Sequence, residues 1–218
     1  GTPLNLGSSG TPRNYLSVVP FNRAVFELTR RWVVDGDPPP RSRLPRVADG
    51  TAVSRRHALD HFAAITGIIT PEEADLLSPT AAGNDVRFPG TAYVSALDQD
   101  GNEVAGIRHP ELSVPLATHT GWNLVLAEGA QWASFGSVTG NSVPFPQRAP
   151  AAMSRDRRRN IRERYRDLDD YVTQIEAAAE LLAAEGFLLA EDVEGIVLAG
   201  RTHFELIAGL QGSTAERA

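Results

Sequence analysis

Histidine, serine and carboxylate side chains are the groups in this sequence that could carry acid–base or nucleophilic chemistry. The surroundings of His119 are the most unusual, because Thr118 and Thr120 flank it in a stretch without formal charge after Glu111. A hydrogen-bonded, partly buried imidazole is the favoured interpretation, and a general base is the alternative. A general base would need a nucleophile and an orienting carboxylate beside it, and the sequence alone does not identify them.

The other histidines give weaker signals. His57 and His61 are four residues apart, which places both on one face of a helix. Two ligands do not make a zinc site, so a solvated helix face is favoured and no metal is predicted. His203 falls in the helical C-terminal region, where we expect it to be exposed.

The segment from Asp98 resembles a calcium loop at first. Asp98, Asp100 and Asn102 occupy positions one, three and five, but Glu103 replaces the glycine at six and His109 the carboxylate at twelve. We therefore predict an Asp-Gly turn that joins strands at 91–97 and 104–108 in a hairpin.

Several catalytic signatures are absent from the sequence. There is no Gly-x-Ser-x-Gly elbow, no His-Glu-x-x-His, no phosphate loop and no dinucleotide fingerprint. No cysteine is present, which excludes disulfides and thiolate metal sites. The sequence therefore predicts no cofactor and shows no activated nucleophile of its own.

The composition limits the partners. The 218 residues are 42% hydrophobic, enough to bury a core, and the net charge of -6 argues against nucleic acid. The basic run at 155–166 is interrupted by acidic residues, so a solvated helix face with local ion pairs is favoured over a phosphate-binding surface. No apolar run reaches the length of a membrane span, and the cellular compartment stays open.

Helical patterns dominate both ends of the chain. Residues 22–35 form an amphipathic pattern that Asn22 could cap and Gly36 could end, followed by a stiff proline-rich connector. Short helices are expected in 54–79, one of them capped by Thr70. From 154 onward we predict almost continuous helix, with one apolar face made of Tyr171, Ile175, Ala178 and Leu182.

Three segments carry a family resemblance, in this order: "LTRRWVVDGDPPPRSRLPRVADGT", "DQDGNEVAGIRHPELSVPLATHTGWNL" and "IRERYRDLDDYVTQIEAAAELLAAEGFLLAEDVEGIV". Together they resemble the C-terminal part of a bacterial family, the alpha/beta hydrolase domain family. The resemblance covers most of residues 24–198 and rests on unusual motifs that recur in the same order. None of these motifs is a catalytic signature.

The resemblance implies an α/β fold, of which this chain would be a mixed α+β fragment with one β-hairpin. Residues 1–36 would be the last loop and helix of the hydrolase core. Residues 37–150 would be a loop-rich added layer, and 151–218 a helical appendage. The chain begins at Gly1 rather than Met, and we expect the missing N-terminal part of the same polypeptide to carry the nucleophile. Leu4 stands where the family pattern would place the catalytic histidine.

The implied function is that of a serine-type hydrolase that cleaves a small-molecule ester or amide, with this chain inactive when isolated. The candidate substrate-binding residues are Arg108, Glu111, Thr118, His119, Thr120, Trp122 and Asn123. An Arg108–Glu111 ion pair could hold them over the pocket mouth. The favoured alternative is that this segment only buries the added layer, with Trp122 as a core aromatic.

Two other functions stay open. The parent protein could be a non-catalytic binding or structural module. The chain could also be a stand-alone binding domain, which is disfavoured because the helix at 22–35 would then leave Phe26, Trp32 and Val33 in water.

Overall fold

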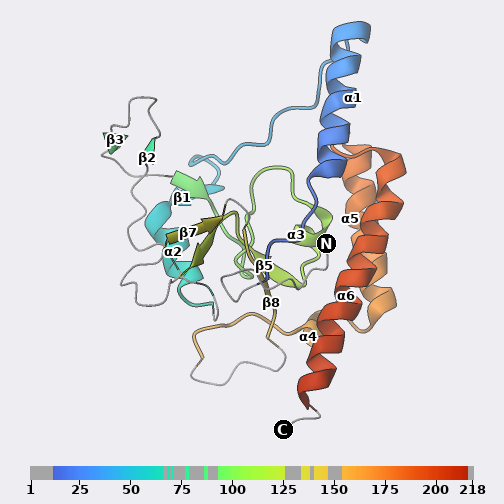
Figure 1. The fold of residues 1–218 in the computed structure, drawn as a ribbon. Helices are drawn as coiled ribbons and strands as arrows, with labels where there is room; N and C mark the ends of the chain where they lie inside the picture. The colour runs from blue at the N-terminus through green and yellow to red at the C-terminus, as the bar shows by residue number, and fades with distance from the viewer. Residues whose placement is uncertain are drawn as a thin grey trace.

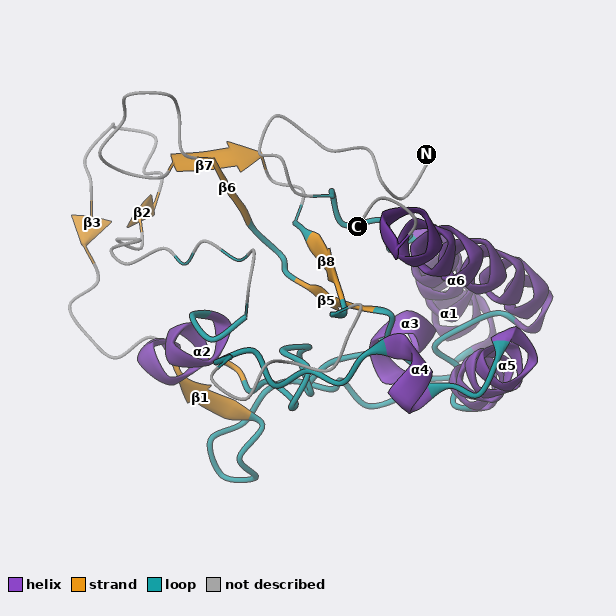
Figure 2. Ribbon diagram, turned by 90° about the horizontal axis from the view of Figure 1, so that it is seen from below, coloured by secondary structure: helices purple, strands orange, loops and turns teal. Residues whose placement is uncertain are grey.

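The computed structural model describes residues 12–65, 68, 70, 77–78, 86–87, 93–125, 134–137, 140–146 and 154–215. Three long helices, α1, α5 and α6, lie together on one side, and short strand pairs with α2 lie on the other (Figures 1 and 2). The small helices α3 and α4 lie between the two sides (Figure 2). The fold is therefore mixed α+β, as predicted.

Helix α1 runs from Val19 to Asp35 and confirms the predicted helix, but it begins three residues earlier than expected. Pro20 occupies its first turn, where a fixed φ and a missing N–H are favourable. The amide of Asn22 already donates to the carbonyl of Val18, so Asn22 is not the cap. Gly36 ends the helix with φ 76°, as predicted.

The first turns of α1 are attached to the rest of the fold. Phe21 packs against the cluster around Leu182 and Ile196, and Arg23 forms ion pairs with Glu191 and Asp192. Beyond this point the helix extends past its neighbours (Figure 1). Its large apolar side chains are exposed: Phe26 by 77%, Trp32 by 57% and Val33 by 78%.

Helices α5 (Leu168–Ala184) and α6 (Val193–Ala215) form a helical hairpin, with the 3-10 turn Ala190–Asp192 between them. Asp167 caps α5 by accepting a hydrogen bond from the amide of Asp170. The predicted apolar face is confirmed, since Tyr171, Ile175 and Leu182 are buried and Ala178 packs against them. This face and α6 contribute to two of the hydrophobic clusters of the core.

The strands pair as four short antiparallel ladders within the described residues. They are β1 (Ala52–Ser54) with β4 (Tyr93–Ser95), β2 (Leu77–Ser78) with β3 (Val86–Arg87), β5 (Ala117–His119) with β8 (Ser142–Pro144), and β6 (Asn123–Val125) with β7 (Ser134–Ser137). The pair β5–β8 lies nearest to the helical side (Figure 2).

The predicted hairpin is correct at its turn and wrong in its strands. Asp98 accepts hydrogen bonds from the amides of Asp100 and Asn102, and a single bridge joins Leu97 to Glu103. Strand β4, however, pairs with β1 rather than with 104–108. Gly106 adopts φ 86°, which bends that segment out of extended conformation.

The short helices are confirmed in part. Helix α2 (Arg55–Phe62), capped by Ser54, lies in the predicted range, whereas α3 (Pro110–Ser113) was not predicted. The predicted helix after Thr70 does not reach Leu77, which begins β2, and 71–76 lie outside the described residues. Trp132 and the loop containing Leu4 also lie outside them.

The predicted near-continuous helix is confirmed from 168 onward and wrong at 154–167. Only α4 (Ile161–Arg164) is helical between 154 and 167, and a capping box between Asn160 and Glu163 fixes its start. Arg158, which precedes α4, makes tertiary contacts with Thr118 and the carbonyl of Val143 instead of lying on a solvated face.

Candidate functional site

The uncharged stretch around His119 is an interior strand. Thr118, His119 and Thr120 are 0%, 5% and 3% exposed, and β5 pairs with β8 in the middle of the molecule. The side chain of Asn102 supports β5 by donating to the carbonyl of Ala117 and accepting from the amide of His119. Burial of this stretch is therefore supported by hydrogen bonds to its backbone and to most of its polar side chains.

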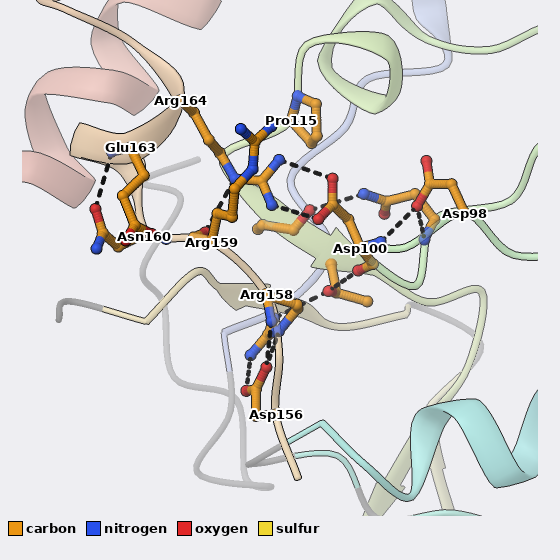
Figure 3. Close-up of polar contacts among 12 residues, drawn as sticks. Asp98, Asp100, Pro115, Asp156, Arg158, Arg159, Asn160, Glu163 and Arg164 are labelled. Carbon is orange, nitrogen blue, oxygen red and sulfur yellow. Dashed lines mark hydrogen bonds and ion pairs between the residues drawn. The ribbon is translucent and has the colours of Figure 1, made fainter. Parts of the chain in front are cut away.

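Two buried ion pairs lie where β5 meets the segment that follows residue 154. Arg158 contacts both carboxylate oxygens of Asp156, at 2.8 and 3.0 Å, and Arg164 binds both oxygens of Asp100 (Figure 3). Arg158 also donates to Thr118 Oγ1 at 2.9 Å. These side chains are at most 7% exposed, so the predicted solvated basic face is wrong at both arginines.

The segment from Asp98, which resembles a calcium loop in sequence, belongs to the same network of ion pairs. Asp98 accepts from its own turn and pairs with Arg108 at 2.7 Å, while Asp100 is neutralised by Arg164. Its oxygens are thus engaged by protein donors, as the turn interpretation requires. Within the described residues, no cluster of histidine and carboxylate side chains could hold a metal ion.

The predicted ion pair between Arg108 and Glu111 does not form. The guanidinium of Arg108 binds Asp98 and the carbonyl of Leu112 instead. The carboxylate of Glu111 lies 2.8 Å from Nδ1 of His203. Helix α3 starts at Pro110 and turns Glu111 inward, so the carboxylate meets α6 and not the loop that carries Arg108.

His203 is buried rather than exposed, which corrects our expectation. It is 9% exposed, and the ring of Tyr15 lies against it with the centroids 4.2 Å apart. The sequence does contain a signal for this position, because the buried positions of α6 recur at helical spacing: Ile196, Gly200, His203 and Ile207. A histidine on such a stripe needs a polar partner, and Glu111 supplies it.

His109, at the start of α3, lies in the same group of residues as Glu111 and His203. Its Nδ1 accepts the amide hydrogen of Glu111 at 3.1 Å, and its ring lies beside Phe21 of α1. Burial lowers the pKa of His109, while the charge of Glu111 acts in the opposite direction. The imidazole is therefore held neutral, with Nδ1 as an acceptor.

His119 and Ser142 form a separate buried pair. Nδ1 of His119 lies 2.9 Å from Oγ of Ser142, and Nε2 is buried without a hydrogen-bond partner. Burial, with smaller contributions from His109 and His203, lowers the pKa of His119 to about 3. This confirms the hydrogen-bonded imidazole. Ser142 is 0% exposed and no carboxylate among the described residues orients the ring, so the pair lacks the features of an active nucleophile.

The remaining predicted site residues contribute to packing. Thr120 Oγ1 donates to the carbonyl of Trp122 and accepts from the amide of Asn141. The ring of Trp122 packs edge-on against Phe62 at 5.4 Å, and Asn123 is 4% exposed. The aromatic pair joins α2 to the strand region, as the packing interpretation of Trp122 requires.

The structure therefore does not gather the predicted residues around one pocket. Glu111 lines a cavity of about 250 Å³ with His109 and His203, between the start of α1 and α6. Arg108 lines a different pocket, of about 470 Å³, beside α5. His109 and His203, which were not predicted to bind substrate, are the histidines that line the cavity with Glu111.

None of the helices in the described part of the chain combines the length and apolar character that crossing a bilayer needs. A family model described as "Alpha/beta hydrolase domain" matches residues 2–198. No curated protein and no solved structure matches the chain.

Proposed function

Because the chain belongs to the alpha/beta hydrolase domain family, whose description indicates hydrolase-type function, we propose that it is part of a serine-type hydrolase. The bond cleaved would be an ester or an amide of a small molecule. The nucleophile would lie in another part of the same polypeptide, since the 218 residues contain no Gly-x-Ser-x-Gly elbow. The isolated chain would then be inactive.

The apolar face of α1 is the observation that carries this proposal. Phe26, Trp32 and Val33 are exposed on a helix whose first turns are firmly attached. In α/β folds such a helical face is buried against a sheet. We therefore assign residues 1–36 to the edge of a hydrolase core, with the rest of that core supplied by the part of the polypeptide that carries the nucleophile.

The other two parts would support the site. Residues 37–150 would form a loop-rich layer, and 151–218 a helical appendage. Burial of Thr118 and His119 favours a supporting role for β5, with Thr120, Trp122 and Asn123 holding the strand region together. Of the residues proposed to bind substrate, Glu111 lines the cavity beside α6 and Arg108 lines the pocket beside α5.

Labelling with a fluorophosphonate probe tests the proposal. The 218-residue chain and the polypeptide encoded by the complete reading frame would be treated in parallel. We expect a labelled serine only in the longer polypeptide, at a position outside these residues, and Ser142→Ala in that polypeptide should label as strongly as the wild type. Labelling of the isolated chain would contradict the proposal. No labelling of either protein would favour the alternative, a non-catalytic binding or structural module.

A further inference from the structure

The cavity beside α6 has walls of two kinds. Val19 and Pro20 at the start of α1, with Ile196 and Ala199 of α6, give it an apolar surface. The polar side chains of the lining are those of Tyr15, Ser17, His109, Glu111, Asp192 and His203. Its volume of about 250 Å³ is below the roughly 300–1,000 Å³ of pockets for drug-sized ligands, so it suits a ligand of few carbon atoms.

The hydrogen bonds of His109 and His203 determine whether the Nε2 atom of each ring can donate to a ligand or accept from it. A carboxylate only accepts, so Nδ1 of His203 carries the hydrogen that it donates to Glu111 at 2.8 Å. A neutral His203 then presents Nε2 as an acceptor, since its hydrogen bond within the described residues is made through Nδ1. His109 has the opposite arrangement, because Nδ1 accepts from the amide of Glu111 and Nε2 carries the hydrogen.

The charges around the cavity select against an anion. Glu111 is 1% exposed, and the carboxylate of Asp192 also lines the cavity. The nearby cation, Arg23, is engaged by Asp192 and Glu191. A second carboxylate in this space would meet like charge at low dielectric.

We propose that this cavity is a binding site for a small neutral alcohol. The hydroxyl donates to Nε2 of His203 and accepts from Nε2–H of His109, and the carbon skeleton lies against Val19, Pro20, Ile196 and Ala199. Glu111 does not touch the ligand; it positions His203 and sets its tautomer. The site stands apart from the proposed nucleophile, so it can be tested whether or not hydrolase activity is found.

A matched ligand series on the full 218-residue chain gives the first test. Binding of cyclohexanol, methoxycyclohexane and cyclohexanecarboxylate would be measured by ligand-observed NMR titration. We expect cyclohexanol to bind about tenfold more tightly than the methyl ether, which cannot donate, and the carboxylate to bind more weakly than cyclohexanol. Equal binding of alcohol and ether, or preferred binding of the carboxylate, would overturn the proposal.

Two variants locate the site. Ala199→Leu fills the cavity from α6 and should abolish cyclohexanol binding, whereas Ala177→Leu makes the same addition on the exposed face of α5 and should leave it intact. Cyclohexanol should also shift the Nε2 resonance of His203 in the wild-type chain, a readout that does not depend on the variants folding. An unmoved resonance, or undiminished binding by a folded Ala199→Leu chain, would place the alcohol elsewhere and refute the assignment.

Discussion

His203 Nδ1 lies 2.8 Å from Glu111 Oε2, and 92 positions of sequence separate the two residues. This contact joins α6 to α3 through two side chains that are almost completely buried. It also closes one side of the cavity lined by His109. The pair therefore links two helices and also lines the cavity.

The Glu111–His203 contact should be measurable as a coupling energy. Glu111→Gln should lower the free energy of unfolding by about 2 kcal/mol, since a charged hydrogen bond in the interior is lost. A double-mutant cycle with His203→Gln, measured by urea denaturation, should give a coupling of about 1–3 kcal/mol. Asp60→Asn, which breaks an exposed pair with Arg56, is the control and should have little effect. A Glu111→Gln variant as stable as the Asp60→Asn control would refute a buried link.

The Asp100–Arg164 pair should be among the most sensitive sites in the chain. Arg164→Met leaves the carboxylate of Asp100 buried and unpaired, and it removes a guanidinium that lies 3.9 Å from the centre of the Phe145 ring. Breaking a buried pair in this way costs about 3–5 kcal/mol. Thermal and urea unfolding of Arg164→Met and of Arg166→Met, an exposed neighbour, would be compared. Similar losses of stability in both variants would mean that burial of the Asp100–Arg164 pair does not determine the loss.

Sequence patterns predicted the elements that depend on residues close together in the sequence. The 3.6-residue period and Gly36 located α1 and its end, and the same period identified the buried face of α5. The turn at Asp98 was recognisable because its own side chain closes it. These features need no information from distant residues.

Contacts between distant residues were the ones missed. Strand β4 pairs with β1, some forty positions earlier, and alternation alone does not specify a partner. The arginines of 158–164 resembled a solvated face because Asp100, which neutralises Arg164, lies far away in sequence. The apolar stripe of α6 could have indicated that His203 is buried, but nothing local identified Glu111 as its partner.

Acid sensitivity should depend on His119. Its pKa falls from the ordinary 6.5 to about 3 in the fold, chiefly through burial, so it stays neutral there while the unfolded chain takes up a proton. Below pH 6.5 the unfolded state therefore binds more protons, and stability falls by about 1.4 kcal/mol per pH unit until the folded-state pKa is reached. The free energy of unfolding of wild type and His119→Gln would be measured by urea denaturation from pH 8 to pH 4. The difference between the two proteins should shrink as the pH falls, and parallel curves would contradict the burial of a neutral imidazole.

Substitutions at two phenylalanines of α1 distinguish packing within this chain from packing against another part of the protein. Phe21 packs beside Leu182 and Ile196, so Phe21→Ser should cost about 2 kcal/mol of unfolding free energy in the 218-residue chain. Phe26 is 77% exposed, so Phe26→Ser should change stability by less than about 0.5 kcal/mol and should reduce binding of an apolar dye. In the longer polypeptide the order should change, because the face that includes Trp32 and Val33 would be covered there, and Phe26→Ser should then destabilise as much as Phe21→Ser. If Phe26→Ser remains harmless in the longer polypeptide, α1 does not pack against the proposed hydrolase core.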